Sequence, residues 1–330
     1  MSLVSLYESL AVPEINDRKV FEAIRIPNRN NIRVAVDGEG NPSLLLSVKK
    51  RGKGQLSKNF KLKYLQVIQN AECTISENGS RSFEVITVIN FLCEDSTLRR
   101  QFLLVSESLI SNLNTEPSHQ DVIDTINKYV EIFRHLSEPP TKTISGLWAE
   151  LFLIESSSDP ETLLIYWHEK PEEKFDFNGG EERIEVKSNS QFERIHFFSS
   201  EQLNPPANCQ VLVVSIFVKQ QNSGVSIQEL IKRITQRINT KSELTLKLNT
   251  VVLATLASSF DQSVGIMFDY DLAQESLKYY HHQDIVKIEK ISIPHRVTEV
   301  RYKSDLSDLA SVRHMGSDSG KLFTALQTMD

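Results

Sequence analysis

Residues Lys174 to Lys187 read Lys-Phe-Asp-Phe-Asn-Gly-Gly-Glu-Glu-Arg-Ile-Glu-Val-Lys. Two short strands are expected on either side of Asn178-Gly179-Gly180, because glycine tolerates the positive φ that a tight reversal needs. In the second strand Glu185 and Lys187 point to one face and their apolar neighbours to the other, since side chains alternate along a strand. The stretch therefore predicts a hairpin that brings Asp176 beside the pair Glu185 and Lys187.

Two carboxylates and a lysine on an otherwise apolar sheet are typical of a site for a divalent ion with an ammonium beside it. The ligands would be the side chains of Asp176 and Glu185 and the backbone carbonyl of Val186. Hard oxygen ligands favour Mg²⁺, with Mn²⁺ as an alternative. A solvent-exposed strand that carries an ordinary Glu/Lys pair has the same pattern, so the triplet alone does not decide between the two.

A helix expected from about Thr143 to Ser156 supplies a further acid, with Thr141 or Thr143 as its N-cap. Glu150 shares a spacing of three and four residues with Leu147, Leu151 and Ile154, so it is expected to point toward the core. A buried carboxylate needs a partner. The alternative is a glutamate at the edge of the apolar stripe that reaches water.

Together, Glu150, Asp176, the triplet Glu185-Val186-Lys187 and the polar Gln191 resemble the PD-(D/E)XK nuclease superfamily, which has the restriction-endonuclease-like fold. The expected order of helix, three strands, helix and strand also matches, and the resemblance covers roughly residues 143–220. One departure is Phe175-Asp176, where the superfamily motif has Pro-Asp. The likeness extends to bacterial proteins of this superfamily from phage-defence neighbourhoods.

The resemblance implies a Mg²⁺-dependent DNA endonuclease of restriction or phage defence. It assigns catalytic roles to Glu150, Asp176, Glu185, Lys187 and Gln191, and metal binding to Asp176, Glu185, Val186 and Glu150. An alternative is a DNA-binding or scaffolding subunit that is inactive or needs a helicase, ATPase or methyltransferase partner. A third is an interaction protein with a chance Glu-x-Lys triplet. A homodimer is expected if both DNA strands are cut, because this takes two active sites.

The fold class expected is α+β or α/β, with two domains. Residues 1–138 predict a mostly antiparallel β domain that is also a candidate for DNA contact. The dipeptide Pro139-Pro140 marks the junction. Residues 139–330 predict a nuclease-like αβββαβ core, whose first short strand is expected at 163–167, followed by C-terminal helical and strand additions.

The chain has 330 residues and a formal net charge of −6, which argues against a protein that coats nucleic acid through bulk electrostatics. DNA contact would then depend on local basic groups. The candidates are Lys49, Lys50, Arg51, Lys53, Arg194 and His196, although a basic loop is often simply solvated. No apolar run approaches the ~20 residues of a membrane span and no leader pattern is evident, so a cytoplasmic protein without membrane contact is expected.

Overall fold

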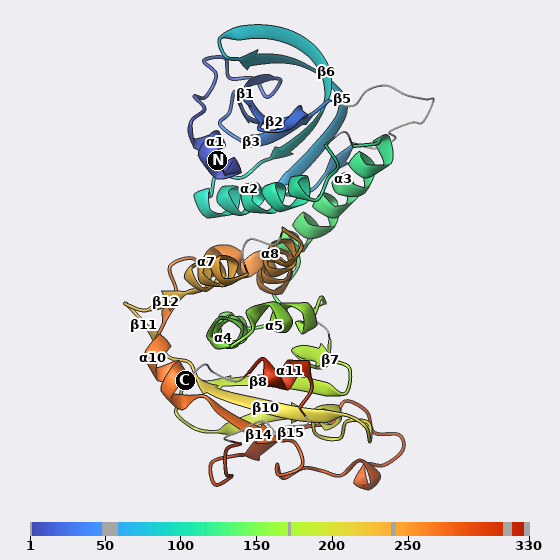
Figure 1. The fold of residues 1–330 in the computed structure, drawn as a ribbon, viewed down its shortest axis with the longest axis vertical. Coiled ribbons are helices and arrows are strands. Elements are labelled where there is room, and N and C mark those ends of the chain that lie inside the picture. Colours follow the sequence, from blue (N-terminus) through green and yellow to red (C-terminus); the bar gives the residue numbers. More distant parts are fainter. Residues whose placement is uncertain are drawn as a thin grey trace. The chain divides into compact units, whose positions relative to one another are not determined.

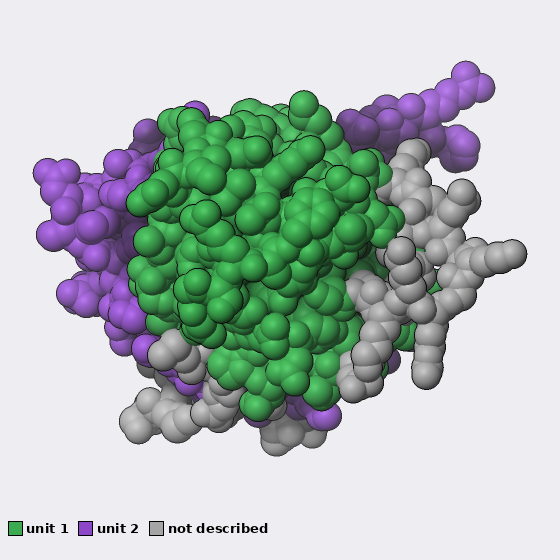
Figure 2. Space-filling view, turned by 90° about the horizontal axis from the view of Figure 1, so that it is seen from above, with its two compact units in different colours: residues 1–139, 257–261 green, residues 140–256, 262–330 purple. Residues whose placement is uncertain are grey.

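The computed structural model describes residues 2–47, 59–115, 117–170, 173–238, 242–312 and 319–326. The chain divides into two compact units (Figure 2). Unit 1 comprises residues 1–139 and 257–261, and unit 2 comprises residues 140–256 and 262–330. Among the described residues, no helix is both long and apolar enough to cross a membrane.

Unit 1 combines a β-sheet with helices. In chain order its elements are α1 (Leu3–Glu8), β1 (Val20–Ile26), β2 (Arg29–Asp37), β3 (Pro42–Leu46), β4 (Phe60–Lys61), β5 (Leu65–Glu77), β6 (Ser80–Phe91), α2 (Ser96–Ser111), α3 (His119–Arg134), η1 (His135–Ser137) and η2 (Ala257–Ser259).

The sheet of unit 1 closes into a barrel (Figure 1). Its strand order is β1-β2-β3-β6-β5-β4, and β1 also pairs with β5, which closes the ring of β1, β2, β3, β6 and β5 and leaves β4 attached to β5. The β1–β5 pairing is parallel and the others are antiparallel. Closure removes the exposed edges that an open sheet would present. The predicted antiparallel character is therefore correct for all pairings except the one that makes the barrel.

The β5–β6 hairpin shows how local sequence sets this fold. Glu77 pairs with Ser80, so the turn consists of Asn78 and Gly79. Both residues have positive φ, 52° and 77°, as a two-residue hairpin turn requires. Inward side chains from β1, β2, β3, β5 and β6 then form the barrel core: Phe21, Ala23, Ala35, Leu45, Cys73, Ile75, Ile86 and Val88.

Unit 2 contains the candidate site. Its elements are α4 (Ile144–Ser156), α5 (Pro160–Tyr166), β7 (Phe177–Gly179), β8 (Glu182–Asn189), β9 (Ile195–Ser199), α6 (Ser200–Leu203), β10 (Gln210–Phe217), β11 (Gln220–Gln221), β12 (Val225–Ser226), α7 (Ile227–Arg237), α8 (Ser242–Leu256), β13 (Met267–Phe268), α10 (Tyr270–Ser276), β14 (Lys278–His281), η3 (Lys290–Ser292), β15 (Arg301–Asp305) and α11 (Lys321–Thr324). Helix α9 (Phe260–Ser263) spans the unit boundary.

A four-stranded sheet with the order β14-β10-β8-β7 forms the centre of unit 2. Strands β8 and β10 are parallel, whereas β7 and β14 run antiparallel to their neighbours. Helix α4 lies between this sheet and the pair α7 and α8 (Figure 1). Its residues from 147 to 154 are buried because the helix is covered on both sides.

The predicted αβββαβ order is wrong at its first strand. Residues 163–167 were expected to form a strand, but α5 occupies this region. Asp159 caps α5 by accepting from the Thr162 amide, and Pro160 stands at its start, where proline is favoured. A short apolar run has no period that separates strand from helix, so these capping residues decided the outcome.

The third predicted strand is β8, which forms where expected, but a further strand, β9, was not predicted. Strand β9 pairs with β15 in a separate two-stranded sheet and does not join the order β14-β10-β8-β7. The structure is thus a mixed α/β protein in which the restriction-endonuclease-like core expected from the sequence is not reproduced strand for strand.

Candidate active site

The β7–β8 hairpin positions the first pair of candidate residues. Phe177 pairs with Ile184 and the turn lies at Gly180 and Glu181, with Gly180 at φ +79°. Asp176 directly precedes β7, and its Oδ2 accepts a hydrogen bond of 2.7 Å from the Val186 amide. The predicted hairpin is confirmed, although Asn178 and Gly179 belong to β7 and not to the turn, and the hairpin fixes Asp176 against the Glu-x-Lys strand.

Helix α4 brings Glu150 to the same place. Thr143 is its N-cap and accepts from the Gly146 amide. Glu150 is only 2% exposed, and its Oε2 accepts from Trp167 Nε1 at 2.8 Å and lies 3.1 Å from His168 Nε2. The predicted inward orientation of Glu150 is confirmed, and these ring nitrogens are the partners that a buried carboxylate needs.

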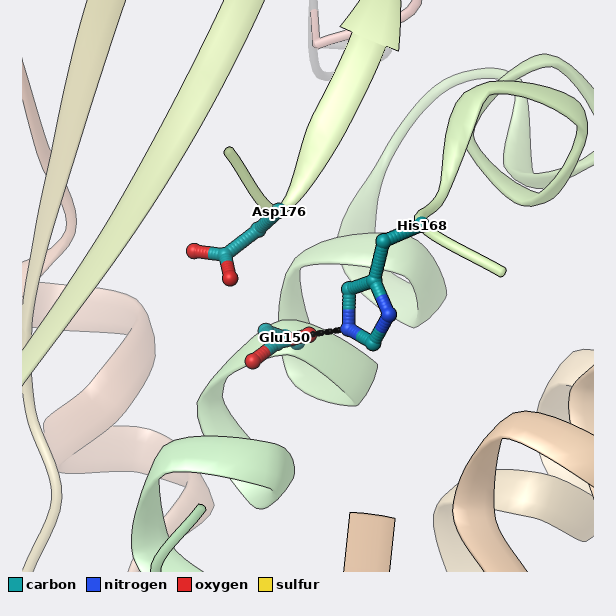
Figure 3. A group of neighbouring side chains, drawn as sticks. All are labelled: Glu150, His168 and Asp176. Carbon is teal, nitrogen blue, oxygen red and sulfur yellow. Dashed lines mark hydrogen bonds and ion pairs between the residues drawn. The ribbon is translucent and has the colours of Figure 1, made fainter. Parts of the chain in front are cut away.

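Lys142 lies among these acids. Its Nζ is 2.6 Å from Glu150 Oε1, donates a hydrogen bond to Asp176 Oδ1, and is 3.3 Å from His168 Nε2. Figure 3 shows that Glu150, His168 and Asp176 point toward one another, with one ligand atom of each within 4.8 Å of the others. The backbone amide of His168 also donates to the Asp176 carbonyl, which holds these segments together.

The second lysine belongs to the Glu-x-Lys triplet. Lys187 Nζ is 2.6 Å from Glu185 Oε1 and 3.4 Å from Gln202 Oε1. Gln202 lies on α6, where its side chain also completes a capping box with Ser199. The predicted shared face of Glu185 and Lys187 is confirmed. The other Glu185 oxygen, Oε2, is buried and has no hydrogen-bond partner among the described residues.

The two glutamates differ in their proton affinity. Burial would raise the pKa of Glu150, but the Lys142 charge and the hydrogen bond with His168 lower it to about 2. Burial and the neighbouring Asp176 charge raise the pKa of Glu185 to about 7, against the opposing effect of Lys187. Burial acts to lower the pKa of Lys142, yet Glu150 and Asp176 raise it above its ordinary value. Glu150 and Lys142 thus form a fully ionised pair.

Similarity to known proteins identifies the family of this chain. A family model described as a putative PD-(D/E)XK family member (DUF4420) matches residues 4–307. The chain belongs to this family. No curated protein and no solved structure matches the chain. Membership in a PD-(D/E)XK family indicates a nuclease-like protein, and the acids and lysine described above are the residues that carry the resemblance to this superfamily.

The residues of this candidate site fit a divalent ion. Glu185 Oε2 is a buried carboxylate oxygen without a partner among the described residues, and Asp176 lies beside it. The N–H and C=O of one residue point to the same edge of a strand. Because the Val186 amide bonds to Asp176, the Val186 carbonyl faces the same side. Three oxygen ligands and an uncompensated negative charge suit a hard cation.

Gln191, the fifth predicted catalytic residue, lies elsewhere. It is exposed beyond the end of β8, and its backbone amide bonds to Asn189 Oδ1. No contact between Gln191 and the acids is found in the described structure. Gln202, from the next helix, contacts Lys187 instead. The structure thus places a different glutamine beside the lysine, because α6 follows β9 back toward β8.

Arg194 and His196, the predicted phosphate contacts, are buried at 6% and 4% exposure. Arg194 donates to the Ser215 and Ser276 carbonyls and to Ser215 Oγ, and His196 Nε2 lies 2.8 Å from the same Oγ. Their placement does not support phosphate contact, since these groups already bind the interior of unit 2. The basic residues Lys49, Lys50, Arg51 and Lys53 lie outside the described residues.

Lys142, Trp167, His168 and Gln202 were missed by the sequence reasoning. Trp167 and His168 follow directly after α5, the segment expected to be a strand, and the error in that element hid them. Lys142 is next to the N-cap of α4 and eight residues before Glu150, so its position about two helical turns from Glu150 was a usable signal. Gln202 gave none, because its approach to Lys187 depends on β9 and α6.

Proposed function

We propose that the protein is a Mg²⁺- or Mn²⁺-dependent DNA endonuclease that hydrolyses phosphodiester bonds in restriction or phage defence. The observation that carries the proposal is the convergence of Asp176, Glu185 and Lys187 on one hairpin, with Glu185 Oε2 buried and unpartnered among the described residues. An unpaired buried carboxylate costs about 1–3 kcal/mol or more, so a cation that binds there recovers this free energy. Family membership supports the same class of reaction.

Asp176, Glu185 and the Val186 carbonyl would hold the ion. A divalent ion bound there would polarise a phosphate oxygen and lower the pKa of a water molecule enough for it to attack. The Val186 amide orients Asp176, and Gln202 and Glu185 hold the Lys187 ammonium between them.

Lys187 has the role of a compact positive charge beside the reacting phosphate. Its ammonium carries three donors, of which the two described oxygens occupy two. The remaining donor is available for a phosphate oxygen or for the attacking water. A charge fixed in advance stabilises the additional negative charge of the transition state without reorganisation.

The test is cleavage of plasmid DNA by the purified chain with Mg²⁺ or Mn²⁺. Glu185→Gln and Lys187→Met are each expected to reduce the rate by about 10³-fold, in the range of losses seen when a transition-state contact is removed. Glu181→Gln on the exposed hairpin turn is the matched control and is expected to keep the wild-type rate.

Wild-type cleavage by Glu185→Gln and Lys187→Met would reject the assignment. If the purified chain binds Mn²⁺ but cuts no DNA, the result favours a nuclease that needs a helicase, ATPase or methyltransferase partner. Analytical ultracentrifugation of the active form would then show whether two copies assemble for double-strand cleavage.

A further inference from the structure

The cluster has one half in which the glutamate oxygens are paired and one open half. In the paired half, both oxygens of Glu150 have donors: Lys142 at Oε1, and Trp167 at Oε2 with His168 close by. The Nδ1 atom of His168 in this half is buried without a hydrogen-bond partner among the described residues. In the open half, Glu185 is 5% exposed, and its Oε2 has no partner among the described residues. The unmet demand for positive charge therefore lies at Glu185.

The Lys142 ammonium occupies the position where Glu150, His168 and Asp176 converge. These three groups have the donor set and spacing of a metal site. Lys142 Nζ contacts all three, and its side chain is 21% exposed. A divalent ion could enter only by breaking contacts with two buried carboxylates, each of which stabilises the ammonium strongly at this depth.

The backbone on both sides of Lys142 is held in place. The Thr141 amide donates to the Thr255 carbonyl at 3.2 Å, and Thr143 caps α4. These contacts restrict withdrawal of the side chain by movement of its backbone. The ammonium is thus a fixed part of the cluster.

We propose that the Lys142 ammonium is the second cation of this site, and that one divalent ion binds, between Asp176 and Glu185. In this arrangement Glu150 holds Lys142 and not a metal, which replaces its expected role as a ligand. Asp176 would serve both cations, because its Oδ1 accepts from Lys142 and its Oδ2 lies on the side of Val186. The inference rests on the proposed metal site but not on DNA cleavage.

The first test is the number of Mn²⁺ ions bound per chain, measured by calorimetric and electron paramagnetic resonance titration. The wild type is expected to bind one ion. Lys142→Met is expected to bind two, because removal of the ammonium frees the pocket of Glu150, His168 and Asp176. Lys278→Met, at an exposed lysine on β14, is the control and should bind one.

The second test asks whether Mn²⁺ has a directly bonded imidazole nitrogen, by electron spin-echo envelope modulation. Nitrogen modulation is expected in Lys142→Met and not in the wild type, and it should disappear in Lys142→Met/His168→Phe. Two ions or nitrogen modulation in the wild type would overturn the proposal, because the metal would then displace Lys142. A single ion in folded Lys142→Met would overturn it as well.

Removal of a buried lysine can also prevent folding. In that case Lys142→Met/Glu150→Gln, which removes both charges of the pair, is expected to fold and to bind a single ion. A second ion bound by this double variant would overturn the proposal, and the wild-type titration remains decisive in either case.

If the wild type cleaves DNA, the cleavage rate of Lys142→Met should fall by about 100-fold at low Mn²⁺ and recover at high Mn²⁺. Failure of cleavage alone would reject the nuclease proposal and leave the ion count standing.

Discussion

Two charge clusters, one around the buried Arg33 of unit 1 and one around Glu150 and Glu185 of unit 2, have similar composition and different completeness. In unit 1, Arg33 donates to Glu77 Oε2 and to both oxygens of Glu84, Arg25 binds Glu77 Oε1, and Ser82 also donates to Glu84 Oε1. Every oxygen of Glu77 and Glu84 has a donor. In the unit 2 cluster, Glu185 Oε2 has none among the described residues.

This is the difference expected between a charge cluster that supports the fold and one that binds a ligand. Buried ionic groups cost desolvation energy, which only complete pairing recovers. A cluster with every group paired can contribute to folding but has no group left for a ligand. An incomplete cluster keeps one carboxylate oxygen for a cation at the expense of stability, as functional sites commonly do.

The largest expected effect on stability comes from replacing Arg33 in the fully paired cluster of unit 1. Arg33→Met removes the Arg33 guanidinium from Glu77 and Glu84, and the free energy of unfolding of unit 1 should fall by about 3 kcal/mol, the lower end for a broken ion pair because both glutamates are partly exposed. Glu185→Gln should change it by less than about 1 kcal/mol, because the amide oxygen can still accept from Lys187 and a buried charge is removed. Guanidinium denaturation measures both.

Arg33→Met/Glu84→Gln serves as the control, since removing the partner charge should restore part of the lost stability. Equal losses for Arg33→Met and Glu185→Gln would contradict the distinction between the clusters.

A second effect on stability concerns Glu182, which lies on the same strand, β8, as Glu185. Glu182 accepts from the amides of Gly320, Leu322 and Phe323 and so caps α11. Glu182→Ala should cost about 2–3 kcal/mol, the range for hydrogen bonds to a charged group, and should speed proteolysis near the C-terminal end. Limited proteolysis with mass spectrometry reports this. Unchanged cleavage would mean that Glu182 does not hold α11.

A third effect concerns pH and His196. Burial, with Lys187 and Arg194 nearby, lowers the pKa of His196 from 6.5 to about 4, and Asp305 acts in the opposite direction. Between these values the unfolded chain binds more protons than the folded one, so stability rises with pH across this window and is lost on acidification. The loss should reach about 2 kcal/mol between pH 6.5 and 4.5.

His196→Gln is the comparison for this pH effect. Its free energy of unfolding, measured by urea denaturation at several pH values, should depend less on pH in that window. Parallel pH curves for the two proteins would rule out His196 as the source.

The smallest expected effect is on the DNA cleavage rate and distinguishes Gln202 from Gln191. Gln202→Ala removes a contact of Lys187, and DNA cleavage should fall by about 10-fold, equivalent to about 1.4 kcal/mol. Gln191→Ala, at an exposed position, should remain within about 2-fold of the wild type. Steady-state cleavage rates decide between them, and the reverse order would restore Gln191 as the site residue.

The sequence predicted those parts of the site that depend on local rules. Alternation along β8 placed Glu185 and Lys187 on one face, and the glycine turn brought Asp176 beside them. Helical spacing directed Glu150 inward. These predictions needed only the period of two in a strand, the period of 3.6 in a helix and the backbone freedom of glycine.

The remaining features depended on contacts between segments that are distant in the chain. The parallel pairing of β1 with β5 closed the barrel, and capping by Asp159 made a helix of an ambiguous apolar run. Packing of α4 against the sheet seated Lys142 between Glu150 and Asp176, and the return of α6 brought Gln202 to Lys187. Periodicity says which way a side chain points but not what it meets, so the sequence alone determined the acids and only the tertiary structure decided which cation each one holds.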